Sequence, residues 1–116
     1  MNQEKRLGQT GEKIAAAHLK SKGYRILKTN LNLKIGEVDI LAQKKDALVL
    51  VEVKTKSNLD FGFPSEMVTA KKRHKLNQLA QMLCFQYPNK DIQLDVIAID
   101  YSKSQPEIDH LENVFF

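Results

Sequence analysis

Asp39, Glu52 and Lys54 are charged residues inside runs of apolar, β-forming residues. Side chains alternate between the two faces of a strand, so Glu52 and Lys54 share one face of the segment 47–54. Both faces of this segment are apolar before Glu52, which predicts a strand that is covered on both sides. The charges are therefore expected where the strand leaves the core.

The turn before this strand predicts that Asp39 and Glu52 are neighbours. A two- or four-residue loop centred between Lys45 and Asp46 fixes the hairpin register and, followed along both strands, places Asp39 opposite Glu52. Their carboxylates would then project from one face, with Cβ atoms about 5 Å apart. Like charges at this distance repel each other and burial makes ionisation harder, so a cation is expected between them.

A divalent metal ion suits this position better than Lys54, because one ammonium group does not satisfy two acids. Carboxylate oxygens with water completing the shell favour Mg²⁺ or Mn²⁺, whereas zinc usually takes His or Cys ligands. Glu12 is a candidate third acid. It lies beside the apolar side of a predicted first helix, in which Gly8 and Gly11 allow close approach to the sheet.

Taken singly, these acids also have ordinary structural interpretations. Glu52 could pair with Lys54 at a sheet edge, and Asp39 could cap a turn. Glu37, at the start of its strand, is expected to be solvated. The sequence Gly-Glu-Val-Asp from Gly36, followed by Glu-Val-Lys from Glu52, lies within strong strand patterns and favours a functional site over these alternatives.

Hydrophobic periodicity predicts an α/β fold with the element order αβββαββ and a mixed sheet with a helix on each face. The first helix, residues 3–22, ends at Gly23, and the second begins near Ser65 and ends at Tyr87. The second helix has an apolar face made of Val68, Leu76, Leu79, Ala80 and Leu83. Strands are expected within residues 23–33, 37–42, 47–54, 92–100 and 107–116.

The chain of 116 residues, 42% of them hydrophobic, is expected to form a single domain over residues 1–116. The N-terminus is polar and no apolar stretch approaches the roughly 20 residues that cross a bilayer, so we expect a cytoplasmic protein without membrane contact. Cys84 is expected as a small buried residue of a helix. No histidine receives a catalytic role and none pairs with another at ligand spacing: His18 is expected in the core, His74 among surface lysines and His110 in the last strand.

Basic residues gather in two places, although the net charge is only +4. Residues 1–34 contain eight Lys and Arg against two Glu, and the start of the second helix carries Lys71, Lys72, Arg73 and Lys75. Such clusters suit a polyanionic partner, because Lys and Arg release condensed counterions from phosphates. A solvated helix face explains Lys71 and Lys75 equally well.

Glu12, Asp39 and Glu52-Val53-Lys54, on a helix and two strands in that order, resemble the PD-(D/E)xK signature of restriction-endonuclease-like nucleases. The chain is more similar still to the bacterial YraN-like family (UPF0102), which is similar to archaeal Holliday-junction resolvases. The similarity covers nearly the whole chain, including GEVDILA from Gly36, LVLVEVKTK from Leu48, VTAKKRHKL from Val68 and LDVIAI from Leu94. Where these proteins commonly carry an arginine soon after Asn30, this chain has Leu31, Asn32 and Leu33.

The resemblance implies a restriction-endonuclease-like three-layer fold and metal-dependent hydrolysis of a phosphodiester bond. Asp39, Glu52 and the backbone carbonyl of Val53 would bind Mg²⁺ or Mn²⁺. Glu12 would contribute to the same site directly or through water. Lys54 would orient the attacking water or stabilise the developing anion.

The resemblance also implies a basic residue near the start of the second helix, which by its position in VTAKKRHKL is Lys72. Lys71, Arg73 and Lys75 would add phosphate contacts, which position DNA without reading its sequence. We therefore expect an endonuclease that acts on branched or Holliday-junction-like DNA. The alternatives are a nucleic-acid-binding module of the same fold with little turnover, and an interaction protein in which the acids and lysine are structural. A homodimer is compatible with the apolar terminus, which could equally close the core.

Overall fold

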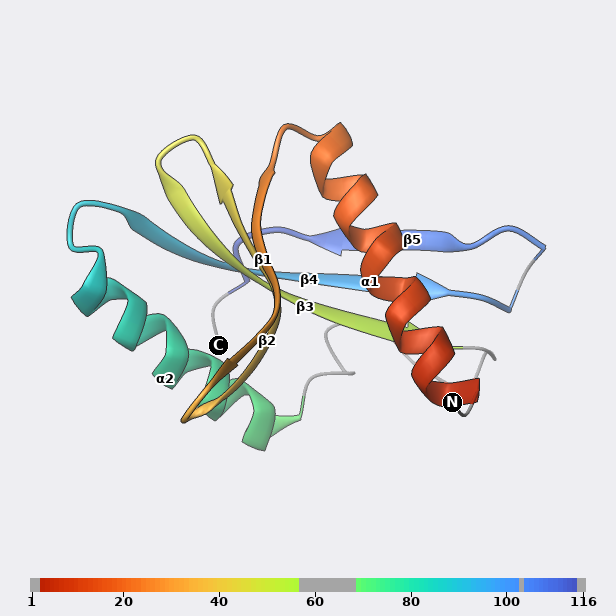
Figure 1. Ribbon diagram of the computed structural model, residues 1–116, viewed down its shortest axis with the longest axis horizontal. Coiled ribbons are helices and arrows are strands. Elements are labelled where there is room, and N and C mark those ends of the chain that lie inside the picture. The colour runs from red at the N-terminus through yellow and green to blue at the C-terminus, as the bar shows by residue number, and fades with distance from the viewer. Residues whose placement is uncertain (1–2, 57–68, 103, 115–116) are drawn as a thin grey trace.

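The computed structural model describes residues 3–56, 69–102 and 104–114, with only the backbone described for residues 3–9 and Lys56. The described elements follow the predicted order αβββαββ, which confirms the α/β fold class (Figure 1). They are α1 (Gln3–Ser21), β1 (Arg25–Leu33), β2 (Gly36–Lys44), β3 (Ala47–Lys56), α2 (Ala70–Gln86), β4 (Asp91–Asp100) and β5 (Glu107–Leu111).

The strands form one mixed sheet in the order β1-β2-β3-β4-β5. β3 and β4 run parallel, whereas the other neighbouring pairs run antiparallel. A parallel pair needs a crossover connection, and α2 lies in the connection between β3 and β4. The charged end of β3 therefore belongs to a central strand of the sheet.

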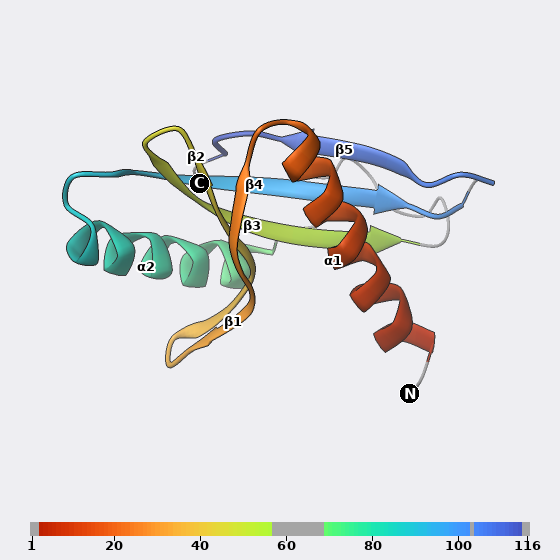
Figure 2. The same cartoon turned by 45° about the horizontal axis from the view of Figure 1, so that its top comes forward.

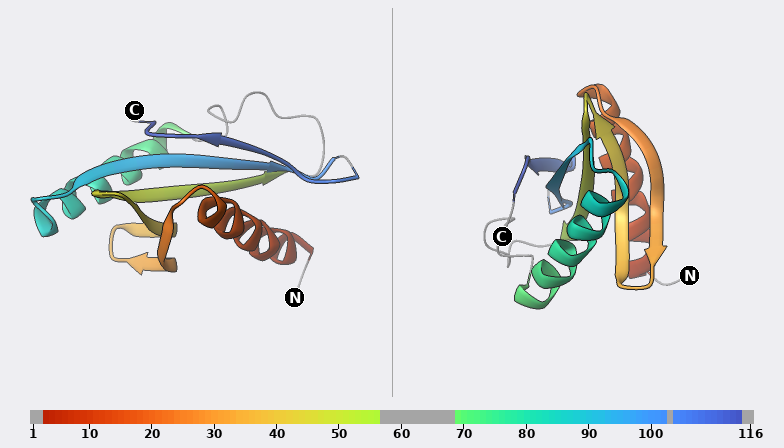
Figure 3. Two further views of the ribbon diagram at one scale, coloured as in Figure 1. Left: turned by 90° about the horizontal axis from the view of Figure 1, so that it is seen from above. Right: turned by 90° about the vertical axis from the view of Figure 1, so that its left-hand side faces the viewer.

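The two helices cover opposite faces of the sheet, as predicted (Figure 3). On one face, Ala15 and Leu19 of α1 pack against Val49 and Val51 of β3. On the other face, the residues of α2 that pack against Leu50 are Leu76, Leu79, Ala80 and Leu83. Each large apolar side chain buried in this way contributes roughly 1.5–3 kcal/mol. Glu52 shares the face of Leu50 and lies on the α2 side.

The predicted ends of the two helices, at Gly23 and Tyr87, agree with the structure, whereas α2 begins later than the predicted start near Ser65. Gly23, with a φ of +90°, follows α1, a conformation that other residues rarely adopt. α2 begins after Thr69, whose side chain accepts a hydrogen bond from the Lys72 N–H. Ser65, the predicted cap, and Val68 lie outside the described residues.

The β1–β2 hairpin changes face part-way along its length. Ile40 packs on the α1 side, whereas Val38 packs on the α2 side. Residues two apart in a regular strand share a face, so β2 must twist sharply at Asp39. Asn30 occupies the corresponding place on β1 and has a φ of 51°. The far end of the hairpin turns out of the plane of β3 and β4 (Figure 2), where Gly36 lies beside α2.

The prediction that Cys84 is buried is wrong. Cys84 is exposed, because the inward positions of the last turns of α2 are taken by Leu79, Ala80 and Leu83. A residue that follows Leu83 is rotated by about 100° around the helix and points outward. Among the described residues, no helix combines the length and the apolar character needed to cross a membrane.

Candidate metal centre

The β2–β3 register brings Asp39 and Glu52 together. The strands pair from Lys44 with Ala47, across the two-residue turn, out to Ile40 with Val51, which is the predicted register. Asp39 is one residue beyond Ile40, and its Oδ2 accepts a hydrogen bond of 2.8 Å from the backbone N–H of Val53, two residues beyond Val51. The Asp39 carboxylate is therefore held against β3, beside Glu52.

The Glu52 carboxylate is buried, with 3% of the residue exposed. Lys54 Nζ lies 3.3 Å from Oε1, and Lys72 Nζ lies 3.6 Å from Oε2. At 3.6 Å the second contact is an ion pair without a hydrogen bond. Glu52 Oε2 has no hydrogen-bond partner in the part of the chain that the structure describes, which is costly for a buried carboxylate oxygen.

Burial is the largest cause that raises the pKa of both acids. The charge of Asp39 raises the pKa of Glu52 further, whereas the ammonium groups of Lys72 and Lys54 lower the pKa of both carboxyls. Lys72 and Lys54 thus compensate only in part for the burial of the two acids. A hard cation between the carboxylates would favour their ionised forms and satisfy Glu52 Oε2.

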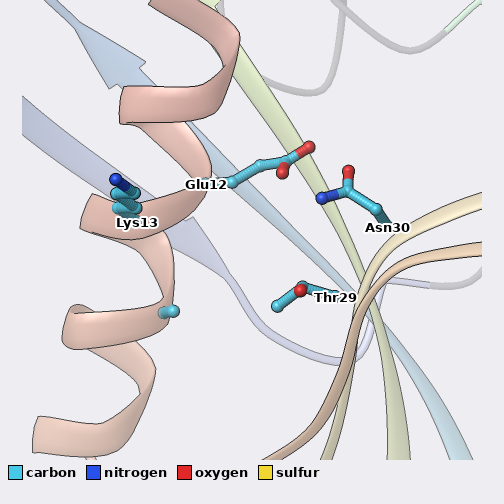
Figure 4. Close-up of a pocket in the computed structure, with 5 residues that line it drawn as sticks. Glu12, Lys13, Thr29 and Asn30 are labelled. Carbon is cyan, nitrogen blue, oxygen red and sulfur yellow. The ribbon is translucent and has the colours of Figure 1, made fainter.

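Glu12, on α1, lies within electrostatic reach of Asp39. Burial raises the pKa of Glu12, a hydrogen bond from the Asn30 side chain lowers it, and the charges of Asp39 and Glu37 raise it. Glu12 also lines a cavity of about 300 Å³ between α1 and β1 (Figure 4). Glu37 is exposed, as predicted.

These residues fit a hard divalent cation. Asp39, Glu52 and Glu12 offer oxygen donors, and one buried oxygen lacks a hydrogen-bond partner, which suits Mg²⁺ or Mn²⁺. The structure thus brings together three predicted site residues, Asp39, Glu52 and Lys54, and places Glu12 where its charge and that of Asp39 act on each other. Their catalytic and metal-binding roles, and that of the Val53 carbonyl, stay predictions.

The basic residues of α2 divide into two groups. Lys72 is half-buried and faces Glu52, so it belongs to the acidic centre as much as to a nucleic-acid surface. Lys71, Arg73 and Lys75 are exposed on the same first turns of α2. They flank Lys72 along α2, and their role as phosphate contacts stays a prediction.

A second polar cluster lies around Asp95, which is fully buried. Asp95 Oδ2 lies 2.8 Å from His110 Nε2 and accepts a hydrogen bond of 2.8 Å from the Tyr24 hydroxyl. Asp95 Oδ1 accepts a hydrogen bond of 2.9 Å from the Asn113 N–H. Glu112 joins the cluster through Tyr24, whose hydroxyl lies 2.7 Å from Glu112 Oε1.

Sequence reasoning missed this cluster, and its conclusion that no histidines pair is wrong. His18 Nε2 lies 3.2 Å from His110 Nδ1, although the two residues are far apart in the chain. The sheet aligns β5 beside β4, and α1 lies against the same end, which the spacing of single histidines does not reveal. The surface position of His74 and the place of His110 in the last strand are confirmed. His18 is hydrogen-bonded but only partly buried, so the expectation that it lies in the core is wrong.

One ligand atom each of Asp95, His110 and Glu112 lies within 4.8 Å of the others, so this group could hold a metal ion. A set containing imidazole would suit zinc better than magnesium. However, the Asn113 N–H, His110 Nε2 and the Tyr24 hydroxyl already lie against the Asp95 oxygens, and Lys44 forms an ion pair of 2.9 Å with Glu112. The cluster is therefore stable without an ion, unlike the Asp39 and Glu52 pair.

The sequence matches the model of the Uncharacterised protein family UPF0102 over residues 11–99. The chain belongs to this family. A UPF0102 protein of Clostridioides difficile is 42% identical over 116 residues, covering 98% of each chain. Another, from Flavobacterium johnsoniae, is 40% identical over 122 residues, covering 100% of this chain and 98% of the relative. These matches confirm the family that the sequence motifs indicated.

Two solved structures are similar to this UPF0102 protein in outline. An EndoMS–dsDNA complex has a TM-score of 0.48 and 16% identity, covering 70% of this chain and 32% of that chain. The structure of Pyrococcus furiosus SfsA in complex with Ca²⁺ has a TM-score of 0.48 and 15% identity, covering 97% of this chain and 65% of that chain. The UPF0102 chain thus spans about a third of the EndoMS chain and about two thirds of the SfsA chain.

Proposed function

We propose that this UPF0102 protein is a cytoplasmic, metal-dependent endonuclease that hydrolyses DNA phosphodiester bonds. The observation that carries the proposal is the pairing of Asp39 with the buried Glu52, one of whose oxygens lacks a hydrogen-bond partner among the described residues. Structural ion pairs normally leave no buried oxygen unsatisfied. Two converging acids with an open coordination position are what a divalent cation needs.

In this proposal, Asp39 and Glu52 bind Mg²⁺ or Mn²⁺, with Glu12 and the Val53 carbonyl as further oxygen donors. The bound cation would supply a nucleophilic water at neutral pH and would stabilise charge on the phosphoryl oxygens. Lys54 Nζ, 3.3 Å from Glu52 Oε1, is placed to donate a hydrogen bond to the attacking water or to a phosphate oxygen. Lys54 and Lys72 together offset part of the cost of ionising the acid pair before the cation binds.

In this proposal, the contacts to the phosphates of the DNA backbone come from the exposed cations Lys71, Arg73 and Lys75. They sit on the first turns of α2, beside Lys72, which contacts Glu52 itself. Contacts of this kind depend on the shape and charge of the backbone rather than on base sequence. A branched or otherwise structured DNA is therefore the proposed substrate.

Cleavage of a panel of DNA substrates tests the proposal. Labelled duplex, flap, single-stranded and four-way DNA would be incubated with the protein and Mg²⁺, Mn²⁺ or a chelator. We expect cleavage that requires the metal and that falls by at least about 100-fold in Asp39→Asn and Glu52→Gln. Asp109→Asn, an exposed aspartate on β5, is the matched control. Cleavage that survives in both acid variants would reject the proposed site.

A DNA-binding module with little turnover is the second candidate, favoured by the exposed cations of α2. It predicts salt-sensitive DNA binding that Asp39→Asn and Glu52→Gln leave intact or strengthen, because removing negative charge favours contact with phosphates. Binding without cleavage of any panel member would favour this candidate over the nuclease.

A further inference from the structure

Asn30 connects α1 to the edge of the candidate metal centre. Its side-chain amide donates a hydrogen bond to the Glu12 carboxylate. The amide nitrogen of Asn30 and the carboxylate of Glu12 face each other beside the cavity that both residues line (Figure 4). The charge of Asp39 acts on the same carboxylate. Glu12 is thus held against β1, within electrostatic reach of Asp39.

The backbone of β1 aims Asn30 at Glu12. Asn30 lies between the residues that pair with Ile40 and Val38, so it stands next to Asp39 across the hairpin. Facing residues on antiparallel strands normally project to the same side of the sheet. The φ of 51° at Asn30 breaks this pattern. The Asn30 amide therefore points toward Glu12 of α1 (Figure 4), whereas the Asp39 carboxylate accepts a hydrogen bond from Val53 of β3. Asparagine is one of the few residues besides glycine that adopt this conformation readily.

We propose that Asn30 is a positioning residue of the metal centre, which fixes the Glu12 carboxylate toward Asp39 so that a third acid is in place when the cation binds. This inference rests on the proposed function, because it requires a cation at Asp39 and Glu52. A hydrogen bond from an amide restricts the rotamers of a carboxylate and sets the direction of its oxygens. Loss of such a partner typically lowers metal affinity 10- to 100-fold.

The variant Asn30→Gly tests the contribution of the side-chain amide independently of the backbone conformation. Glycine adopts a positive φ without steric cost, so the twist of the hairpin is retained while the hydrogen bond to Glu12 is lost. We expect the affinity for Mn²⁺, measured by isothermal titration calorimetry without DNA, to fall about tenfold. Asn32→Gly is the matched control, because Asn32 is an exposed asparagine on the same strand. Equal losses of affinity in the two variants would overturn the proposal.

A double-mutant cycle with Glu12→Gln tests whether Asn30 acts through Glu12. If it does, Asn30→Gly lowers Mn²⁺ affinity in the wild-type protein and leaves the affinity of Glu12→Gln unchanged. The same loss in both backgrounds would reject the positioning role. The Mn²⁺ affinity of Asp39→Asn is measured in the same way. If this variant binds Mn²⁺ as tightly as the wild type, the proposed metal site itself is rejected. Lost affinity in Asp39→Asn with wild-type affinity in Asn30→Gly rejects only the role of Asn30.

Discussion

Asp39 Oδ2 accepts a hydrogen bond of 2.8 Å from the backbone N–H of Val53. This bond ties a side chain of β2 to the backbone of β3, one residue beyond Glu52. The orientation of the Asp39 carboxylate therefore depends on the β3 backbone, whose Val53 carbonyl is the predicted third ligand. Two acids and one carbonyl would thus approach a cation from a single rigid part of the sheet.

Replacing the buried acid should not destabilise the metal-free protein. Burial raises the pKa of Glu52, so its ionisation costs stability as pH rises from the usual carboxyl value of 4.5 through the raised value. Glu52→Gln should therefore be at least as stable as the wild type at pH 7 with chelator present, and lose this advantage below pH 4.5. Urea unfolding at both pH values measures the difference. Destabilisation by more than about 1 kcal/mol at pH 7 would instead identify Glu52 as a structural ion-pair partner.

The lysines of α2 should affect DNA binding in two distinct ways. Lys71→Ala and Lys75→Ala should each reduce the slope of log K against log salt concentration by about 1, because each removes a phosphate contact. Lys72→Ala should also weaken Mn²⁺ binding or its pH dependence, since Lys72 pairs with Glu52. Fluorescence anisotropy over a range of salt concentrations measures the slopes. Lys90→Ala, beyond the other end of α2, is the control, and an equal change there would argue for general electrostatic attraction.

Gly11 sets how closely α1 approaches the sheet. A Cβ at this position would collide with Thr55 Cγ2 of β3, so Gly11→Ala should displace α1 and the neighbouring Glu12. We expect a loss of about 1–3 kcal/mol in the free energy of unfolding, together with weaker Mn²⁺ binding. Thr55→Ser removes the colliding methyl group, so the double variant should recover both quantities. Without such recovery, the effect of Gly11→Ala comes from elsewhere.

The Asp95 cluster should stabilise the fold in a pH-dependent way. Hydrogen bonds from Lys44 and Tyr24 lower the pKa of Glu112 to about 2. A lowered carboxyl pKa contributes stability above the usual value of 4.5, and this stability is lost as pH falls toward 2. Glu112→Gln should therefore be less stable than the wild type at pH 7 and converge with it near pH 2. Chemical unfolding across this range measures the difference, and a gap that does not change with pH would refute the assignment.

The pairing of Asp39 with Glu52 was predictable because short-range rules link these residues. The turn at Lys45 and Asp46 fixes the hairpin register, and that register places Asp39 beside Glu52. The approach of α1 was predictable from Gly11, which has no side chain to keep the helix away from the sheet. The packing around Gly8 lies outside the described residues.

The Asp95 cluster and the orientation of Asn30 toward Glu12 were not predictable in this way. Tyr24, Asp95 and His110 come from separate segments, and only the strand order brings them together. Asn30 shows no periodic signal, because its left-handed backbone interrupts the alternation on which strand prediction depends. Cys84 was misjudged because its apolar neighbours hid its outward position on α2.

The most direct test of the central claim is an anomalous difference map at the manganese edge, from crystals of this protein grown with Mn²⁺. The account predicts a peak between the carboxylates of Asp39 and Glu52, within about 2.0–2.3 Å of an oxygen of each. A peak only at Asp95, His110 and Glu112, or no peak at Asp39 and Glu52 under saturating Mn²⁺, would contradict it.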